Sequence, residues 1–205
     1  MKVIDRIHGG IVHQRRVRVL ADIFASWLPQ DLSILDVGCG DGQLAKELTT
    51  ARPDLKISGV DVLERADCAI SMQAFDGETI PFENNAFDAI LLADVLHHTT
   101  DPCRLLKEAM RVSRELIVIK DHNRNGLFAG ATLRFMDSVG NARHGVALPN
   151  NYWSREQWTA AFQDLGLGID EWTNKVPLYP WPASLLFARR LHFCALLASG
   201  GNSCR

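Results

Sequence analysis

The chain has 205 residues, of which 47% are hydrophobic, and a formal net charge of −2 at pH 7. This length is sufficient for one α/β domain with a full core. A charge so close to neutral disfavours a protein that holds nucleic acid through a large basic surface. The five cysteines are scattered without a Cys-x-x-Cys pair, so we expect no disulfide framework, no zinc site and no other bound metal. Free thiols are typical of a reducing compartment, which predicts a cytoplasmic protein.

The two ends of the chain carry no predicted membrane or targeting segment. Residues 1–10 lack the apolar stretch of a signal peptide. The apolar segment 185–198 is interrupted by charged residues and is too short to span a bilayer, so no integral membrane segment is expected. The predicted organisation is one domain over residues 1–198, of which 1–30 form a helical cap, and a disordered tail over 199–205.

The first predicted element is a helix over residues 11–28, in which apolar side chains recur at helical spacing and would face a sheet. Arg15, Arg16 and Arg18 precede the apolar stripe. We interpret these arginines as a solvated helix face. The alternative is that residues 8–16 cover a bound ligand.

The chain is organised around residues 32–44, LSILDVGCGDGQL. An apolar strand passes through three alternate glycines into a helical pattern, and glycine permits the positive φ angles that such a turn needs. The dinucleotide fingerprint G-x-G-x-x-G is not met, because Gln43 stands where its third glycine belongs. The carboxylates of Asp36 and Asp41 suit a ligand with a cation and hydroxyl groups better than a pyrophosphate. S-adenosylmethionine, which carries a sulfonium, an ammonium and a ribose, is such a ligand.

The second predicted strand, residues 56–61, ends in Asp61, about twenty residues after the glycine turn. An acid at the end of the strand beside the first one can accept hydrogen bonds from both hydroxyls of a ribose. A short third strand over 69–74 leads to the segments 75–77, Phe-Asp-Gly, and 80–82, Ile-Pro-Phe. Acidic residues are therefore expected at the ends of three neighbouring strands.

The fourth predicted strand, FDAILLA at 87–93, lacks polar alternation, as expected of a central parallel strand that is buried on both faces. An Asp-Val-Leu-His-His segment and a helix over 101–113 with an Asp-Pro start follow it. A fifth strand over 115–120 precedes Asp121 and His122. Strands that alternate with helices predict a doubly wound parallel sheet.

The last third of the chain is less diagnostic. Helices are predicted over 127–139 and 154–165, a long loop over 140–153, strands over 169–176 and 190–197, and an aromatic, proline-rich segment over 177–182. The loop and the aromatic segment are expected above strands four to seven, where their side chains would cover a small molecule. The alternative is that these side chains complete the core under the loops.

Residues 33–122 resemble the class I S-adenosylmethionine-dependent methyltransferases, and among them the type 11 family. The shared features occur in the expected order: D-x-G-x-G-x-G at 36–42, an acid after the second strand, the F-D-G…I-P-F loop, and F-D-A-I-L-L-A-D-V-L-H-H at 87–98. Gly77 departs from the alanine that is usual in this family. The resemblance implies an α/β fold with a doubly wound, seven-stranded, mostly parallel sheet (the Rossmann-like methyltransferase fold), an antiparallel last strand, and helices on both faces.

The resemblance also implies S-adenosylmethionine as the cofactor, lying across the carboxyl ends of strands one to four. Asp61 would hold the ribose, and Asp76 would accept a hydrogen bond from the adenine amino group. The implied cofactor-binding residues are Asp36, Gly38, Cys39, Gly40, Gly42, Asp61, Val62, Phe75, Asp76, Gly77, Ala93 and Asp94.

Methyl transfer from a sulfonium is an in-line displacement, in which the enzyme mainly holds the nucleophile on the methyl axis. A base is needed only for an acceptor that carries a proton at the working pH. The candidate bases are His98, His97 and His122, with Asp94 and Asp121 as partners. We prefer His98, because it lies just before a helix N-terminus, which disfavours a charged imidazolium. The alternative for His97 and His98 is a structural turn, and Lys120 is expected to reach solvent.

The predicted function is an S-adenosylmethionine-dependent methyltransferase that acts on a small, at least partly apolar acceptor. The partner is then a small molecule rather than nucleic acid, and the protein is a monomer or a homodimer. One alternative is a non-catalytic binding or partner protein of the same fold. Another is a nicotinamide-dependent oxidoreductase, which Gln43 and the loop at Asp76 disfavour. The N/D-P-P-Y/F signature of base methylation is absent after strand four.

Overall fold

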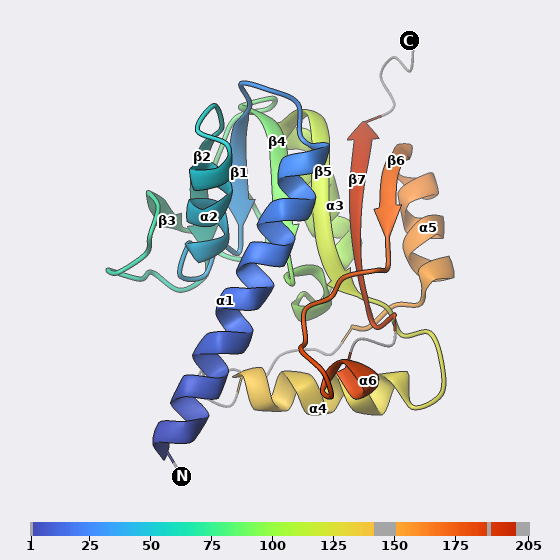
Figure 1. Ribbon diagram of the computed structural model, residues 1–205. Helices are drawn as coiled ribbons and strands as arrows, with labels where there is room; N and C mark the ends of the chain where they lie inside the picture. Colours follow the sequence, from blue (N-terminus) through green and yellow to red (C-terminus); the bar gives the residue numbers. More distant parts are fainter. Residues whose placement is uncertain (1, 142–150, 188–189, 200–205) are drawn as a thin grey trace.

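A mixed seven-stranded β-sheet runs through the computed structural model (Figure 1), which describes residues 2–141, 151–187 and 190–199. The strand order is β3-β2-β1-β4-β5-β7-β6. All neighbours from β3 to β5 are parallel, whereas β7 is antiparallel to both β5 and β6. The predicted doubly wound sheet is therefore confirmed. The strands are β1 (Ser33–Val37), β2 (Lys56–Asp61), β3 (Met72–Ala74), β4 (Phe87–Ala93), β5 (Ser113–His122), β6 (Leu167–Thr173) and β7 (His192–Ser199).

Helices cover both faces of the sheet. They are α1 (Lys2–Trp27), α2 (Gln43–Ala51), the 3-10 turn η1 (Leu96–His98), α3 (Pro102–Val112), α4 (Ala129–Asn141), α5 (Arg155–Asp164) and α6 (Ser184–Phe187). Phe24 of α1 and Leu48 of α2 belong to one buried apolar cluster. Leu106 of α3 and Trp158 of α5 belong to another. The α1–α2 layer and the α3–α5 layer thus bury opposite faces.

The middle of the central strand β4, residues 89–92, is covered on both faces. Ala89 and Leu91 join the cluster that contains α1 and α2, while Ile90 and Leu92 join the cluster that contains α3 and α5. All four side chains are buried. The apolar run of residues 89–93 follows from this position, because helices cover both faces of a parallel sheet. The residues that follow β4 emerge in the middle of the carboxyl edge, between β1 and β5.

The predicted helix starts of α3 and α5 are confirmed. The Asp101 carboxylate accepts a hydrogen bond from the Arg104 backbone N–H at 3.0 Å, with Pro102 in the first turn. Ser154 and Gln157 form a reciprocal capping box, with bonds of 3.3 and 2.9 Å. Both caps satisfy backbone N–H groups that have no partner inside the helix.

Several boundaries differ from the prediction. α1 begins at Lys2 rather than at residue 11, and β3 begins only at Met72. β5 extends to His122, so the acid and histidine predicted to follow this strand are its last residues. Ser199, predicted to belong to a tail, ends β7. The predictions for 142–150 and 200–205 lie outside the described residues.

The carboxyl edge of the parallel strands carries an additional layer. In Figure 1 the arrow of β1 points to the lower edge of the sheet, and α4 and α6 lie beyond that edge. α6 was not predicted. Among the described residues, no helix is both long and apolar enough to cross a membrane.

Candidate active site

The glycine turn after β1 is held by the end of β2. The backbone N–H groups of Gly38 and Cys39 donate to the carbonyl oxygen of Val60, at 2.7 and 3.1 Å. The N–H of Gly40 donates to Asp61 Oδ2 at 2.8 Å. Gly40 has a φ of +58°, and a Cβ built on it would meet no atom within 4 Å. The turn therefore presents open backbone on the side that a ligand would approach.

A cavity of about 150 Å³ lies against this turn. Its lining from the sheet side consists of Asp36, Gly38, Cys39, Gly40, Asp41, Leu44 and Ala93, and its lining from α1 consists of His13, Arg16, Val17 and Leu20. Five of the predicted cofactor-binding positions, Asp36, Gly38, Cys39, Gly40 and Ala93, are therefore brought together in one cavity. We refer to it below as the crevice.

Helix α1 covers the crevice, which corrects the solvated-face interpretation for Arg16. This side chain forms an ion pair with Asp94, just after β4. His13 Nε2 lies 3.3 Å from Asp41 Oδ2, and this hydrogen bond lowers the pKa of the Asp41 carboxyl. The signal was present in the sequence: His13, Arg16, Val17 and Leu20 have i, i+3, i+4, i+7 spacing, so they form one helix face.

Asp36 is the buried acid of the crevice. Burial raises the pKa of its carboxyl to about 7, and the nearby negative charges of Asp61 and Asp41 add to the effect. The raised pKa means that the surroundings of Asp36 supply too little positive charge to stabilise its ionised carboxylate. A bound cation would supply that charge.

The positions predicted to hold the adenosine half are arranged differently. Val62 is 59% exposed, and Asp76 is also exposed, with its Oδ1 accepting the N–H groups of Glu78 and Thr79 at 2.8 and 2.7 Å. Phe75 packs against the core, and Gly77 has a φ of +83°. These residues follow β2 and β3, and none of them lines the crevice.

Two further predicted cofactor-binding residues, Asp61 and Gly42, support the glycine turn. Asp61 Oδ1 accepts the N–H of Leu63 at 2.9 Å, so both of its oxygens already order backbone. At Gly42, a Cβ would lie 2.9 Å from Cys68 Sγ. Gly42 therefore allows close packing under the turn and does not line the crevice.

Asp94 joins the crevice to the end of β5. Its backbone is left-handed, with a φ of +59°, which is uncommon for a residue other than glycine. Its carboxylate contacts both Arg16 and Lys120 Nζ. Burial alone would raise the pKa of Asp94, but the charges of Arg16 and Lys120 hold it well below its usual range. Lys120 is buried, so the expectation that it reaches solvent is wrong: β5 runs through the core, and Asp94 compensates the buried ammonium.

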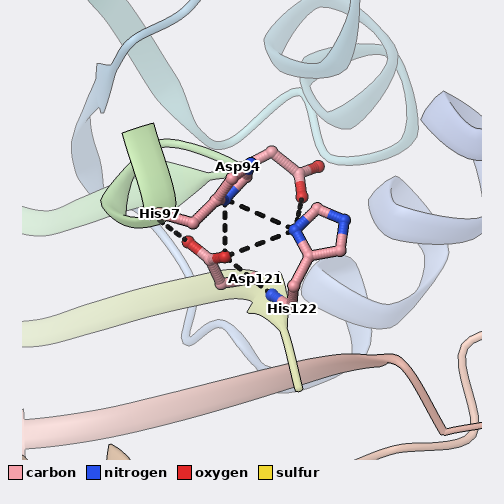
Figure 2. Close-up of side chains that lie close together, drawn as sticks. All are labelled: Asp94, His97, Asp121 and His122. Atoms are coloured by element: carbon pink, nitrogen blue, oxygen red, sulfur yellow. Dashed lines mark hydrogen bonds and ion pairs between the residues drawn. The ribbon is translucent and has the colours of Figure 1, made fainter. Parts of the chain in front are cut away.

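His97 and His122 lie beside Asp94 (Figure 2). His97 Nδ1 lies 2.7 Å from Asp121 Oδ1, and the same oxygen accepts the His122 backbone N–H at 2.6 Å. His122 Nδ1 lies 3.3 Å from His97 Nδ1. Burial would raise the pKa of Asp121, but His97 lowers it below the usual range. The half-buried His98 packs its ring 3.8 Å from that of His97. All three predicted histidines therefore gather in one place.

Apolar side chains gather beyond this polar cluster. Ala129, Leu133, Tyr152 and Leu191 form a small buried group, and the rings of His97 and Tyr152 stack at 5.6 Å. Leu178 of the predicted covering segment is buried in the core, so for this residue the core interpretation holds. Trp181, in contrast, is 79% exposed. Leu178 is thus a core residue, whereas Trp181 lies at the surface.

Residues 11–171 match the family model described as a methyltransferase domain. The chain belongs to the class I S-adenosylmethionine-dependent methyltransferases. This confirms the predicted resemblance, and S-adenosylmethionine is the cofactor of the family. The buried acid Asp36 and the open backbone at Gly40 fit this cofactor, which combines cationic groups with hydroxyls.

Two curated relatives and one solved structure illustrate the likeness. The chain is 27% identical over 110 residues to the 27-O-demethylrifamycin SV methyltransferase of Amycolatopsis mediterranei, covering 46% of this chain and 40% of the relative. It is 34% identical over 86 residues to the demethylmenaquinone methyltransferase of Thermotoga maritima, covering 38% of each. The chain thus spans less than half the length of these relatives. An S-adenosylmethionine-dependent methyltransferase of Mesorhizobium loti superposes with a TM-score of 0.62 at 15% identity, over 86% of this chain and 96% of that one.

Proposed function

We propose that this protein transfers a methyl group from S-adenosylmethionine to a small, at least partly apolar acceptor. The observation that carries the proposal is the crevice itself. Ala93 lines the crevice together with the glycine turn, the buried acid Asp36 and α1, and the next residue, Asp94, belongs to the cluster with His97 and His122. A donor and an acceptor that meet at the end of β4 would be held in line.

We propose that separate parts of the site bind the two halves of the cofactor. The crevice would take the methionyl half of the cofactor, and Asp61 and Asp76 would take the adenosine half on the open surface beside it. Bound S-adenosylmethionine supplies an electrophilic methyl group on a sulfonium. Arg16 would keep α1 closed over the site by its ion pair with Asp94, so water is excluded where methyl transfer takes place.

For an acceptor that carries a proton, we propose His98 as the base, with His97 and His122 as the other candidates. His98 Nδ1 is buried and its ring packs on His97, at the turn between β4 and α3. His98→Asn should lower turnover by a factor of about 100 to 10,000 while cofactor affinity stays nearly unchanged. Unaltered turnover would remove His98 from the mechanism and leave His97 or His122.

Two observations support an apolar acceptor. Exposed apolar side chains of the layer beyond the carboxyl edge include Phe128, Phe135, Trp181 and Leu185. The relatives include a demethylmenaquinone methyltransferase, named for a quinone acceptor. A methyl-release assay over phenols, quinols, amines and glycans tests this proposal. Turnover confined to polar glycans would contradict it.

The same assay distinguishes a catalytic protein from one that only binds the cofactor. A protein that only binds the cofactor would show S-adenosylmethionine binding without conversion to S-adenosylhomocysteine across the panel. We propose catalysis instead, because polar side chains with shifted pKa values converge where the acceptor would lie, as is typical of active sites.

A further inference from the structure

At the carboxyl ends of β4 and β5, four side chains bring potential metal-ligand atoms close together (Figure 2). One ligand atom from each of Asp94, His97, Asp121 and His122 lies within 4.8 Å of all the others. Three of these residues are buried, and Asp94 is nearly so. Two come from the segment after β4 and two from β5, so the main chain of the core holds the set in place. We propose that these four residues bind one divalent transition-metal ion, with Zn²⁺ as the best match.

Three distances, all from His122 Nδ1, agree with tetrahedral coordination. Ligand atoms about 2.0 to 2.1 Å from a tetrahedral zinc ion are about 3.3 to 3.4 Å from one another. His122 Nδ1 lies 3.3 Å from His97 Nδ1, 3.5 Å from Asp121 Oδ1 and 3.5 Å from Asp94 Oδ1. The 2.7 Å contact between His97 Nδ1 and Asp121 Oδ1 is shorter, at a hydrogen-bond length. Asp94 Oδ1 also accepts a hydrogen bond from Lys120 Nζ. The His97 and Asp121 ligand atoms would separate by about 0.6 to 0.7 Å, with the His97 proton moving to Nε2.

The chemistry of the donor set selects the class of ion. Imidazole nitrogen is a preferred ligand of zinc and iron, while sets made only of oxygen suit magnesium and calcium. Two imidazoles and two carboxylates therefore favour Zn²⁺ over Mg²⁺. His192, buried with its ring 5.0 Å from the ring of His122, has neither ring nitrogen hydrogen-bonded in the described part of the chain. It adds a further donor beside the four ligands.

The nearby cations determine how the site can be tested. Asp94 contacts Lys120 Nζ and Arg16, so its charge is already compensated. A metal ion would be repelled by the Lys120 ammonium across Asp94. Lys120→Met should therefore tighten metal binding. A purely hydrogen-bonded network predicts no metal binding in either protein, so this variant distinguishes the two interpretations.

The experiment uses the purified chain after dialysis against a chelator. Co²⁺ is titrated and followed by visible absorption, and Zn²⁺ is titrated against a chromophoric chelator. We expect one ion per chain, Co²⁺ bands typical of tetrahedral coordination, and tighter binding by Lys120→Met. His122→Ala should weaken binding by about 100-fold or more, because it removes a ligand rather than an outer partner. Thermal melting checks that each variant is folded.

The matched control is His13→Ala. His13 and Asp41 form a second histidine–carboxylate contact, half-exposed in the lining of the crevice, and accessible pairs of this kind collect metal non-specifically. Stoichiometry and affinity should be unchanged in this variant. The proposal is overturned if neither the wild type nor Lys120→Met retains an ion, or if His13→Ala abolishes the binding. These readouts do not involve methyl transfer, so they stand whatever the acceptor is.

Discussion

Arg16 of helix α1 forms an ion pair with Asp94, the residue that directly follows the central strand β4. The two residues are 78 positions apart in the chain, and their contact closes the helix over the crevice. A segment that precedes the sheet in sequence thereby becomes one wall of the proposed cofactor site.

Arg16→Ala should destabilise the fold and open the crevice. The variant leaves the buried Asp94 with Lys120 as its remaining strong cationic partner, so we expect a loss of about 1 to 3 kcal/mol in the free energy of unfolding. Urea denaturation measures this loss. Arg18→Ala is the control, because Arg18 is largely exposed and lies 4.0 Å from Glu47. Its effect should stay within about 0.5 kcal/mol. Equal effects of the two substitutions would show that the Asp94 contact contributes no stability.

Asp36 makes stability depend on pH. Its pKa is about 7 in the folded chain against a usual 3.8, so between these values the folded state binds a proton that the unfolded state lacks. The free energy of unfolding therefore falls as pH rises through this range. Asp36→Asn removes that dependence, and its stability relative to the wild type should increase by about 2 to 3 kcal/mol between pH 5 and pH 8.

Asp88 provides the control for this prediction. The hydroxyl and backbone N–H of Ser33, together with Arg114, lower its pKa to about 2, so it is ionised in both states from pH 5 to pH 8. Asp88→Asn should shift stability equally at the two pH values. An Asp36→Asn effect that is also independent of pH would contradict the raised pKa of Asp36.

Gly40→Ala should separate cofactor binding from folding. The added Cβ would meet no protein atom within 4 Å but would project where the cofactor is expected to approach the turn. Gly166→Ala has a comparable backbone strain, with a φ of +71° and equally open surroundings. Both variants should lose about 1 kcal/mol of stability. Only Gly40→Ala should lose affinity for S-adenosylmethionine, as measured by calorimetry, and similar affinities in the two variants would place the cofactor elsewhere.

Asp61→Ala should weaken S-adenosylmethionine binding by about 1 to 3 kcal/mol. One cause is the loss of the carboxylate that is expected to accept hydrogen bonds from the ribose. A second cause is that Asp61 accepts the N–H of Gly40 and so holds the glycine turn in place. Asp170→Ala, on the exposed side of edge strand β6, is the control. Titration of both variants measures the difference. Wild-type affinity in Asp61→Ala would exclude the end of β2 from the cofactor site.

The sheet could be predicted from sequence because each strand carries its own signal. β4 is apolar except for Asp88 near its start, and the turn at Gly38 and Gly40 stands between a strand and a helix. Helix caps such as Ser154 are equally local. Periodicity and capping are short-range properties, so a single sequence reveals them.

The polar interior could not be predicted in the same way. Lys120 occupies a strand end, where lysine normally reaches solvent, and only the fold shows that Asp94 and Arg16 meet it. Likewise, nothing in the spacing of His97 and His122 shows that their Nδ1 atoms face each other. Contacts between residues far apart in the chain depend on topology, and compensation of buried charge is a property of the assembled core.

Isothermal titration with S-adenosylmethionine tests the central claim most directly, with NADH as the comparison ligand. We expect one equivalent of S-adenosylmethionine to bind per chain and NADH not to bind. The Gly40→Ala variant should reduce the S-adenosylmethionine signal under the same conditions. Binding of NADH without binding of S-adenosylmethionine would contradict the account.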